Sequence, residues 1–127
     1  MNDRIAPFLV RARAHVKRGM DSSRHRMGGA GVVDALNQAL AMELVCALRC
    51  RRHHHMADSL RCKEAAGEFL EHSCDETMHA DQIARRILEL GGEPNFSPAG
   101  LVQRSDVEYV EGRTLEEMVQ EDLAAVR

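Results

Sequence analysis

Apolar residues recur along residues 32–57 at the spacing of one α-helical face. Leu36, Leu40, Ala47 and Cys50 are separated by gaps of four, seven and three residues. Such gaps return to the same side of a helix, so they form one apolar stripe. We therefore predict a helix over residues 32–57, roughly 37 Å long at about 1.5 Å per residue.

A second apolar pattern, along residues 60–90, predicts a helix that folds back on the first. Its stripe repeats strictly every seven residues, at Cys62, Phe69, Glu76, Ile83 and Leu90. Gly91-Gly92 followed by Pro94 is a strong signal for the end of a helix. The short polar sequence at residues 57–60 predicts a tight link, and therefore an antiparallel hairpin.

The segments on either side of this hairpin are less regular. Residues 1–26 predict a short amphipathic helix that begins or breaks near Pro7, and the glycines at residues 28–31 predict a linker. After the hairpin, a stretch rich in glycine and proline predicts little more than one short turn around residues 106–110. Thr114-Leu-Glu-Glu117 then has the form of a capping box, which predicts a last helix.

The composition supports an all-α fold, a helical hairpin that is part of a four-helix bundle. The chain has no Trp, one Tyr and three Phe, so its core must consist of aliphatic residues and Met, which suit helices. We divide it into a basic N-terminal part, residues 1–31, and an incomplete helical domain, residues 32–127. The first residues hold no apolar run long enough for a signal peptide or a membrane span, so we expect a soluble cytoplasmic protein.

Charge is unevenly distributed along the chain. Residues 1–26 hold seven Lys or Arg and two Asp, a net charge of +5, whereas the whole chain has a net charge of −3. The simplest interpretation is a packing helix with a solvated basic face. The alternative is a basic arm that binds an acidic partner such as nucleic acid.

Two glutamates interrupt the apolar stripes of the predicted hairpin. Glu76 and His79 are three residues apart and share one helix face. Glu43 precedes Glu76 by 33 residues, so a hairpin that turns within residues 57–60 places Glu43 level with Glu76. A carboxylate buried alone is unfavourable by several kcal/mol, so each glutamate requires a partner or a proton.

Glu43, Glu76 and His79 are therefore the candidate metal ligands. Carboxylate and imidazole together suit iron or manganese. Two glutamates and one histidine are half the ligand set of a di-iron carboxylate site in a helix bundle. The structural alternative is a polar break in the helical seam that fixes register or oligomeric state.

The other histidines and the cysteines predict weaker or structural roles. His53, His54 and His55 are neighbours at a helix end and point in three directions, so at most one can join a given site. A solvated helix end is the favoured interpretation, and a secondary metal contact, with His54 on the Glu43 stripe, is the alternative. His72 lies one turn before Glu76 and can support a metal ligand or an interface. We expect the four cysteines, which include Cys46, Cys50 and Cys74, to be free thiols in the core. A disulfide or a thiolate metal site is the alternative.

The residues around the glutamates resemble the bacterioferritins and their miniferritin-like relatives, over roughly residues 32–126. The resemblance is carried by Leu36-Asn-Gln-Ala-Leu-Ala-Met-Glu43-Leu44, Asp75-Glu76-Thr-Met-His79-Ala-Asp81 and Arg86-Ile-Leu-Glu-Leu-Gly-Gly-Glu-Pro94. It implies a four-helix ferritin fold, oxidation of Fe(II) at a di-iron site and storage of the ferric mineral in a hollow shell. It also implies that Glu43, Glu76 and His79 are the iron ligands of the first two helices.

Three departures from this family are informative. Thr77 occupies the place where haem-binding members have a Met directly after the glutamate, and Met78 is one step later, so haem is not expected. Val126 stands where the third-helix motif Asp-Leu-Ala-x-Glu has a ligand. The sequence therefore resembles a ferritin-like chain cut short after the start of the third bundle helix.

These observations lead to alternative hypotheses about function. In the first, the chain is an iron-binding homo-oligomer in which a second copy completes a di-iron site for oxidation of Fe(II) by dioxygen. In the second, it is an inactive, truncated helical interaction module. A third and weaker hypothesis is miniferritin-like DNA binding through the basic arm, which would be sensitive to salt. Whether the chain is an enzyme of the ferroxidase type depends on completion of the site.

Overall fold

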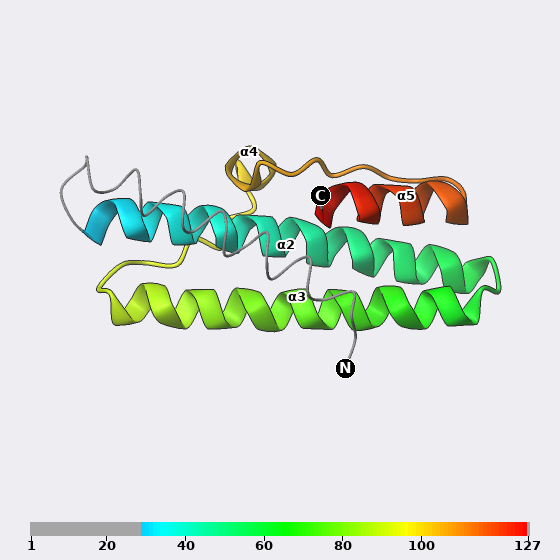
Figure 1. Cartoon of the computed structure of the whole chain (residues 1–127), viewed down its shortest axis with the longest axis horizontal. Helices are drawn as coiled ribbons and strands as arrows, with labels where there is room; N and C mark the ends of the chain where they lie inside the picture. The colour runs from blue at the N-terminus through cyan, green and yellow to red at the C-terminus, as the bar shows by residue number, and fades with distance from the viewer. Residues whose placement is uncertain (1–28, 127) are drawn as a thin grey trace.

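The fold is an antiparallel helical hairpin with two shorter helices on one side. The computed structural model describes the backbone of residues 29–126 and the side chains of residues 31–121. Its helices are α2 (Gly29–Ser59), α3 (Lys63–Glu89), α4 (Leu101–Ser105) and α5 (Leu115–Val126). Helices α2 and α3 run side by side, and α4 and α5 lie across α2 from α3 (Figure 1). The prediction of an all-α hairpin is confirmed, whereas the helix predicted for residues 1–26 falls outside the described residues.

The connection from α3 to α5 is one long crossover. Residues 90–114 leave the end of α3, pass through α4, and follow α2 to the opposite end of the hairpin (Figure 1). Helix α5 then returns antiparallel to α2. A bundle with one such crossover differs from a simple up-and-down bundle, in which all connections are short.

The predicted long helices are confirmed, with boundaries that differ by up to three residues. Two local predictions are wrong. Residues 29–31 of the predicted linker belong to a helix instead, because α2 begins at Gly29 and Gly31 is buried. The short turn lies at Leu101–Ser105 rather than residues 106–110, because Gly100 and Asp106, with φ of 72° and 57°, begin and end it in the left-handed conformation.

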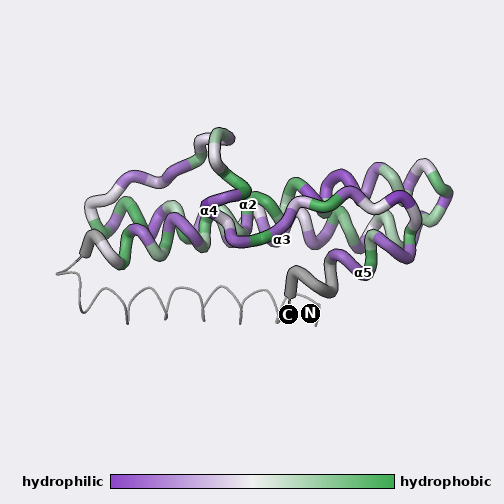
Figure 2. The backbone as a smooth tube through the Cα atoms, turned by 90° about the horizontal axis from the view of Figure 1, so that it is seen from above, coloured by the Kyte–Doolittle hydropathy of each residue, from purple (hydrophilic) through white to green (hydrophobic). Residues whose placement is uncertain are grey.

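The core consists of three clusters distributed along α2. The first joins the N-terminal half of α2 to the C-terminal half of α3 through Leu36, Leu40, Ala80 and Ile87. The second joins the middle of α2 to α4 and the crossover through Met42, Val45, Cys46 and Val107. The third, at the hairpin turn, holds Ala57, Ala66, Phe69 and Met118 of α5. Apolar and polar residues alternate along both long helices, as in amphipathic core helices (Figure 2).

The strict seven-residue stripe predicted for α3 is only partly buried. Phe69 and Glu76 are buried, whereas Leu90 exposes 39% of its surface. A straight helix drifts by about 20° for every seven residues, so the core-facing positions move away from that repeat. The residues that α3 buries are Ala66, Phe69, Ser73, Glu76, His79, Ala80 and Ile87.

Both long helices end in the same type of hydrogen-bonded cap. After α3, Gly92 N–H donates to Ile87 O at 2.9 Å and Gly91 N–H donates to Leu88 O at 3.0 Å. Gly91 has a φ of 79°, as this motif requires. A Cβ at Gly92 would lie 2.7 Å from Cγ1 of Val33, so this glycine also allows the close approach of α2.

The end of α2 has the same cap with an arginine in the left-handed position. Cys62 N–H donates to Ala57 O at 2.9 Å, and Arg61 has a φ of 62°. We expect Arg61→Gly to raise the free energy of unfolding by about 0.5–1 kcal/mol, because glycine adopts this conformation without a Cβ penalty. Urea unfolding of the two proteins measures the difference. An equal or lower midpoint for Arg61→Gly would mean that the turn is not strained.

The capping box predicted at the start of α5 is confirmed in one of its two bonds. Thr114 Oγ1 accepts a hydrogen bond from Glu117 N–H at 3.2 Å. The side chain of Glu117 accepts its bond from Arg113 N–H at 2.8 Å, rather than from Thr114 N–H. The cap therefore begins α5 one residue after Thr114.

Helix α2 is long and apolar, as is typical of a core helix in a bundle. By length and composition, residues 31–59 are sufficient to cross a membrane, but 61% of the tested window is buried inside the protein. The helix also buries Glu43 and Arg49 among its apolar residues. A core helix of a bundle meets the same criterion, so this segment is weak evidence for a membrane span.

Candidate metal centre

The hairpin brings Glu43 of α2 to His79 of α3. Glu43 Oε2 lies 3.5 Å from His79 Nδ1, and Ser73 Oγ donates a hydrogen bond to Ala47 O at 2.8 Å. On α3, Ser73 lies three residues before Glu76 and His79 lies three residues after it. Their contacts with α2 therefore place Glu76 within one helical turn of the level of Glu43. The sequence predicts that Glu43 lies level with Glu76. In the structure the link between the helices occupies residues 60–62 rather than 57–60, so the two helices are offset from the predicted register by about one turn.

All three predicted ligands are removed from solvent. Glu43 and Glu76 each expose 1% of their surface and His79 exposes 7%. Neither carboxylate oxygen of Glu43 has a hydrogen-bond partner among the described residues. The 3.5 Å separation from His79 is longer than a good hydrogen bond. Because these buried carboxylate oxygens have no hydrogen-bond partner among the described residues, they are available to coordinate a cation.

Burial and the Glu43–His79 contact change the ionisation of both groups. Removal from water raises the pKa of the Glu43 carboxyl above its usual value, and the contact with His79 partly opposes this rise. The pKa of His79 is also raised, chiefly by its contact with Glu43, with desolvation acting against the rise. The negative charge of Asp75 raises the pKa of His79 further.

The described part of the chain does not assemble a complete metal site by itself. Among the described residues, no group of three or more His, Cys, Asp or Glu side chains is arranged to hold a metal ion. Glu43 and His79 are brought together, and Glu76 is buried one turn before His79 on α3. Joint coordination of one ion by Glu43, Glu76 and His79 therefore stays a prediction.

The histidines at the end of α2 have separate structural roles. His54 Nδ1 lies 2.7 Å from Ala66 O, which engages this ring with the first turn of α3. His55 is exposed and packs edge-on against His54, with ring centroids 4.8 Å apart. A secondary metal contact at His54 is therefore not supported by its geometry. His72 is half-buried on α3.

His53 is a buried contact that the sequence analysis missed. Its ring is fully buried, with Nε2 3.4 Å from Glu121 Oε2 of α5 and the ring edge-on to Phe69 at 5.2 Å. The signal was available, because Cys46, Cys50 and His53 follow one another at spacings of four and three residues. His53 therefore continues a buried face of α2 and is not part of a solvated helix end.

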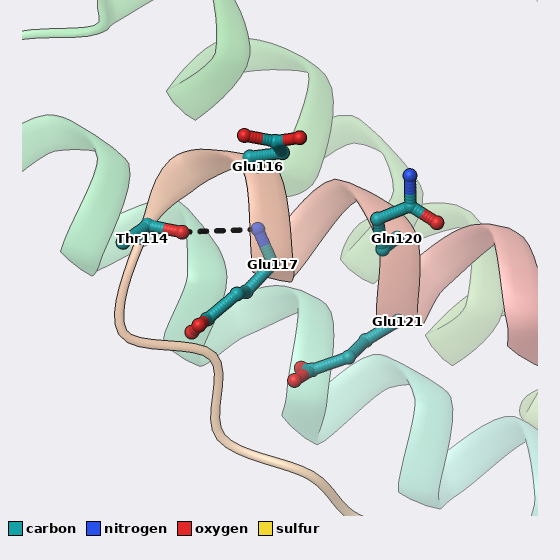
Figure 3. A pocket seen from close by; sticks show the side chains of 5 residues that line it. All are labelled: Thr114, Glu116, Glu117, Gln120 and Glu121. Atoms are coloured by element: carbon teal, nitrogen blue, oxygen red, sulfur yellow. Dashed lines mark hydrogen bonds between the residues drawn. The ribbon is translucent and has the colours of Figure 1, made fainter.

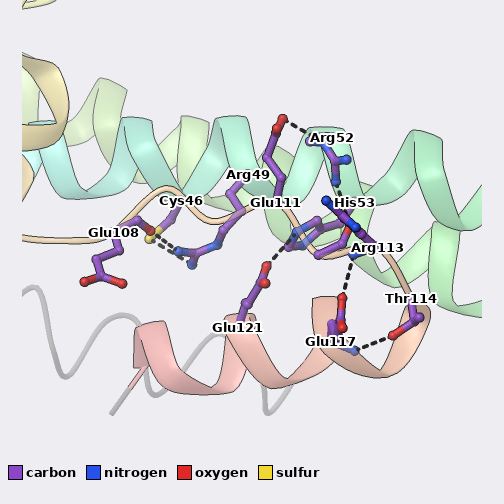
Figure 4. Close-up of polar contacts among 11 residues, drawn as sticks. Cys46, Arg49, Arg52, His53, Glu108, Glu111, Arg113, Thr114, Glu117 and Glu121 are labelled. Atoms are coloured by element: carbon purple, nitrogen blue, oxygen red, sulfur yellow. Dashed lines mark hydrogen bonds and ion pairs between the residues drawn. The ribbon is translucent and has the colours of Figure 1, made fainter.

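Two arginines of α2 hold the crossover against the helix (Figure 4). Arg49 donates to Glu108 O at 2.8 Å, and Arg52 donates to Gly112 O at 3.2 Å and pairs with Glu111 at 2.9 Å. A Cβ at Gly112 would lie 2.8 Å from the backbone N of Met118, so the crossover and α5 are in close contact. These contacts fix α5 over the C-terminal half of α2.

A solvent-open cavity of about 450 Å³ lies along α5 (Figure 3). Its lining is polar and acidic: Thr114, Glu116, Glu117, Gln120 and Glu121. None of the three predicted metal ligands lines it. The cavity is adjacent to the His53–Glu121 contact and is separate from the Glu43–His79 pair.

The four cysteines all lie within the described residues and form no disulfide. Cys46 and Cys50 are buried, as predicted for core thiols. The prediction is wrong for Cys74, which is exposed and has its sulfur 3.7 Å from a guanidinium nitrogen of Arg51.

Comparison with known proteins places these features in a family. Residues 33–127 match the family model of the ferritin-like domain. The bacterioferritin of Desulfovibrio desulfuricans is 38% identical over 73 residues, which cover 58% of this chain and 41% of the relative. The bacterioferritin of Mycobacterium bovis is 34% identical over 97 residues, which cover 76% of this chain and 57% of the relative. The chain thus spans about half the length of the curated relatives it matches.

Proposed function

Because the chain belongs to the ferritin-like family, we propose that it binds Fe(II), oxidises it with dioxygen and serves iron storage or detoxification in the cytoplasm. The observation that carries the proposal is the buried Glu43–His79 pair, with Glu76 on the same helix as His79. A deprotonated carboxylate and a neutral imidazole are the groups that bind iron. The names of the bacterioferritin relatives support the same metal.

A second copy of the chain supplies the coordination that one hairpin lacks. Two-fold pairing would give two sets of Glu43, Glu76 and His79, which is four carboxylates and two imidazoles, the ligand set of a di-iron site. Each iron would be held by Glu43 and His79 together as terminal ligands, and Glu76 would be able to bridge. The protein's contribution is to hold the two Fe(II) substrates close together for transfer of their electrons to dioxygen.

Haem is not part of this proposal. Thr77 follows Glu76 directly, and a threonine hydroxyl is a poor axial ligand for haem iron compared with a thioether or an imidazole. Met78, the nearest thioether, exposes 50% of its surface and lies about 200° from Glu76 at roughly 100° per residue.

The alternative is an inert helical interaction module. The observation that favours it is the absence, among the described residues, of a ready group of three metal-binding side chains. The two functions predict different results for iron oxidation. The iron-binding protein should oxidise Fe(II) at a rate that depends on self-association, whereas the inert module should not oxidise it.

We expect the rate of Fe(II) oxidation to rise faster than linearly with protein concentration near the dimer dissociation constant. One protomer offers two carboxylates and one imidazole, which are too few for a bridged iron pair. The rate is measured by absorbance under air across a dilution series, with the oligomeric state followed by light scattering. A buffer blank gives the uncatalysed rate.

Two results would contradict this expectation in different ways. A rate equal to the blank for a dimeric preparation would favour the inert module. A rate strictly proportional to concentration down to proven monomer would mean that one chain is sufficient, and that the assignment of the ligands is wrong.

A further inference from the structure

A buried serine joins the two long helices close to the candidate metal centre. Ser73 exposes 1% of its surface, and its Oγ donates a hydrogen bond to the backbone O of Ala47 at 2.8 Å. On α2, Ala47 is one helical turn after Glu43, and on α3, Ser73 is one turn before Glu76. Residues one turn apart share a helix face, so the bond and these two glutamates lie along the same seam between the helices.

This bond is not the one that a hydroxyl within a helix usually makes. Serine and threonine side chains in helices tend to donate to a carbonyl of the preceding turn of their own helix. Thr77 does so, because its Oγ1 donates to Ser73 O at 2.9 Å. The hydroxyl of Ser73 instead reaches across to α2. It therefore joins a side chain of one helix to a backbone atom of the other.

A bond of this kind limits how far one helix can slide along the other. Apolar contacts allow small slides because burial is not directional, whereas a hydrogen bond weakens steeply when its length and angle change. The link between the helices sets their register only at a distance. Glu43 lies 16 residues before the end of α2 at Ser59, roughly 24 Å at about 1.5 Å per residue. The Ser73–Ala47 bond sets the register beside the predicted ligands.

We propose that Ser73 is a positioning residue for the metal centre. Its bond to Ala47 holds α3 in the register that brings His79 Nδ1 to 3.5 Å from Glu43 Oε2. The effect on metal binding rests on the proposed function, whereas the positioning of His79 against Glu43 is a property of the metal-free protein. Removal of the hydroxyl leaves no carbonyl unsatisfied, because a carbonyl inside a helix already accepts from the N–H four residues later. Ser73→Ala should therefore keep the hairpin and lose its exact register.

Nuclear magnetic resonance of the full chain in chelator tests the positioning. A nuclear Overhauser cross-peak should connect the side-chain protons of Glu43 with the ring protons of His79, and its intensity falls with the sixth power of their distance. A slide of α3 by one residue, about 1.5 Å, should lower this intensity by about twofold or more, which is the result expected for Ser73→Ala. Thr77→Val is the matched control, because it removes a hydroxyl whose bond stays within α3. Its cross-peak should equal that of the wild type.

Binding of Mn(II), followed by electron paramagnetic resonance, tests the consequence for the metal. Ser73→Ala should bind Mn(II) roughly tenfold more weakly than the wild type, which is the scale expected when a group that orients a ligand is removed. Thr77→Val should bind it as the wild type does. Melting curves by circular dichroism verify that each variant is folded at the temperature used. Ser73→Cys, which keeps the shape of the side chain but is a weak donor, replaces Ser73→Ala if that variant does not fold.

The outcomes separate this inference from the proposed function. An absent cross-peak in the wild type, an unchanged one in folded Ser73→Ala, or an equal loss in Thr77→Val would overturn the positioning role. A weakened cross-peak with an unchanged affinity for Mn(II) would overturn its consequence for the metal. If Ser73→Ala alone weakens the cross-peak and the wild type does not bind Mn(II), the positioning by Ser73 is supported and the proposed function fails.

Discussion

Glu76→Gln should lower the rate of Fe(II) oxidation by roughly a hundredfold or more, whereas His72→Ala should lower it less, by about tenfold, the lower end of the range for a group that only supports a ligand. Loss of a group that only supports a metal ligand typically lowers affinity or activity by about 10- to 100-fold. Loss of a bridging ligand should therefore lower the rate by at least about 100-fold. Glutamine keeps the shape of the buried side chain but carries no negative charge for iron. Stopped-flow absorbance under air measures both rates.

Glu89→Gln is the matched control for this comparison. Glu89 is on the same helix, is exposed, and pairs with Arg86 at 2.8 Å. Its replacement should leave the rate unchanged. If Glu76→Gln and Glu89→Gln are equally active, Glu76 is a structural carboxylate and the di-iron proposal fails.

The long helices could be predicted because the sequence marks both their faces and their ends. The apolar stripe of α2, at Leu36, Leu40, Ala47 and Cys50, is buried throughout. Gly91-Gly92 ends α3 with the expected hydrogen bonds, and Thr114 caps the start of α5. These signals are local, so they hold without knowledge of the tertiary structure.

The register of the hairpin depends on a turn that the sequence does not mark. Arg61 adopts a left-handed conformation that glycine usually takes, so no glycine indicates the true turn at residues 60–62. The prediction placed the turn too early, and Glu43 therefore contacts His79 rather than lying level with Glu76. A shift of two or three residues in a link is small for the fold but decisive for the geometry of a site.

The contacts of the crossover could not be predicted because they join residues distant in sequence. Arg49 is 59 residues from Glu108 in sequence, and its bond is to a backbone carbonyl, which any residue at position 108 would offer. His53 was hidden for a different reason. Its two histidine neighbours made a solvated helix end the simpler interpretation, although its contact with Glu121 on α5 buries it fully.

The same burial that prepares Glu43 for a metal should make it unfavourable in the metal-free protein at neutral pH. Its raised pKa means that the folded state binds the proton of this carboxyl more tightly than the unfolded state does, so the resulting stability is present at low pH and is lost as pH rises through the folded pKa. The pKa of His79 is raised as well, so stability from protonated His79 is present below its usual pKa of 6.5 and is lost as pH rises through the folded value. Each group therefore makes the metal-free protein less stable as pH rises from its usual pKa, 4.5 for the carboxyl and 6.5 for the imidazole, through its raised folded value.

Glu43→Gln should therefore raise the free energy of unfolding of the metal-free protein at pH 8 by about 1–3 kcal/mol and flatten its dependence on pH. Glutamine has nearly the same shape, carries no charge to desolvate, and removes the partner that raises the pKa of His79. Metal binding has the opposite pH dependence, because iron and manganese require the deprotonated carboxylate. Urea unfolding at pH 5 and pH 8, with a chelator or with Mn(II), measures all four conditions. The variant should be the more stable protein in chelator and the less stable one in saturating Mn(II). If Mn(II) stabilises the variant as much as the wild type, Glu43 is not a metal ligand. If the variant is the less stable protein in chelator at pH 8, the carboxylate of Glu43 makes a favourable interaction that outweighs the cost of its burial.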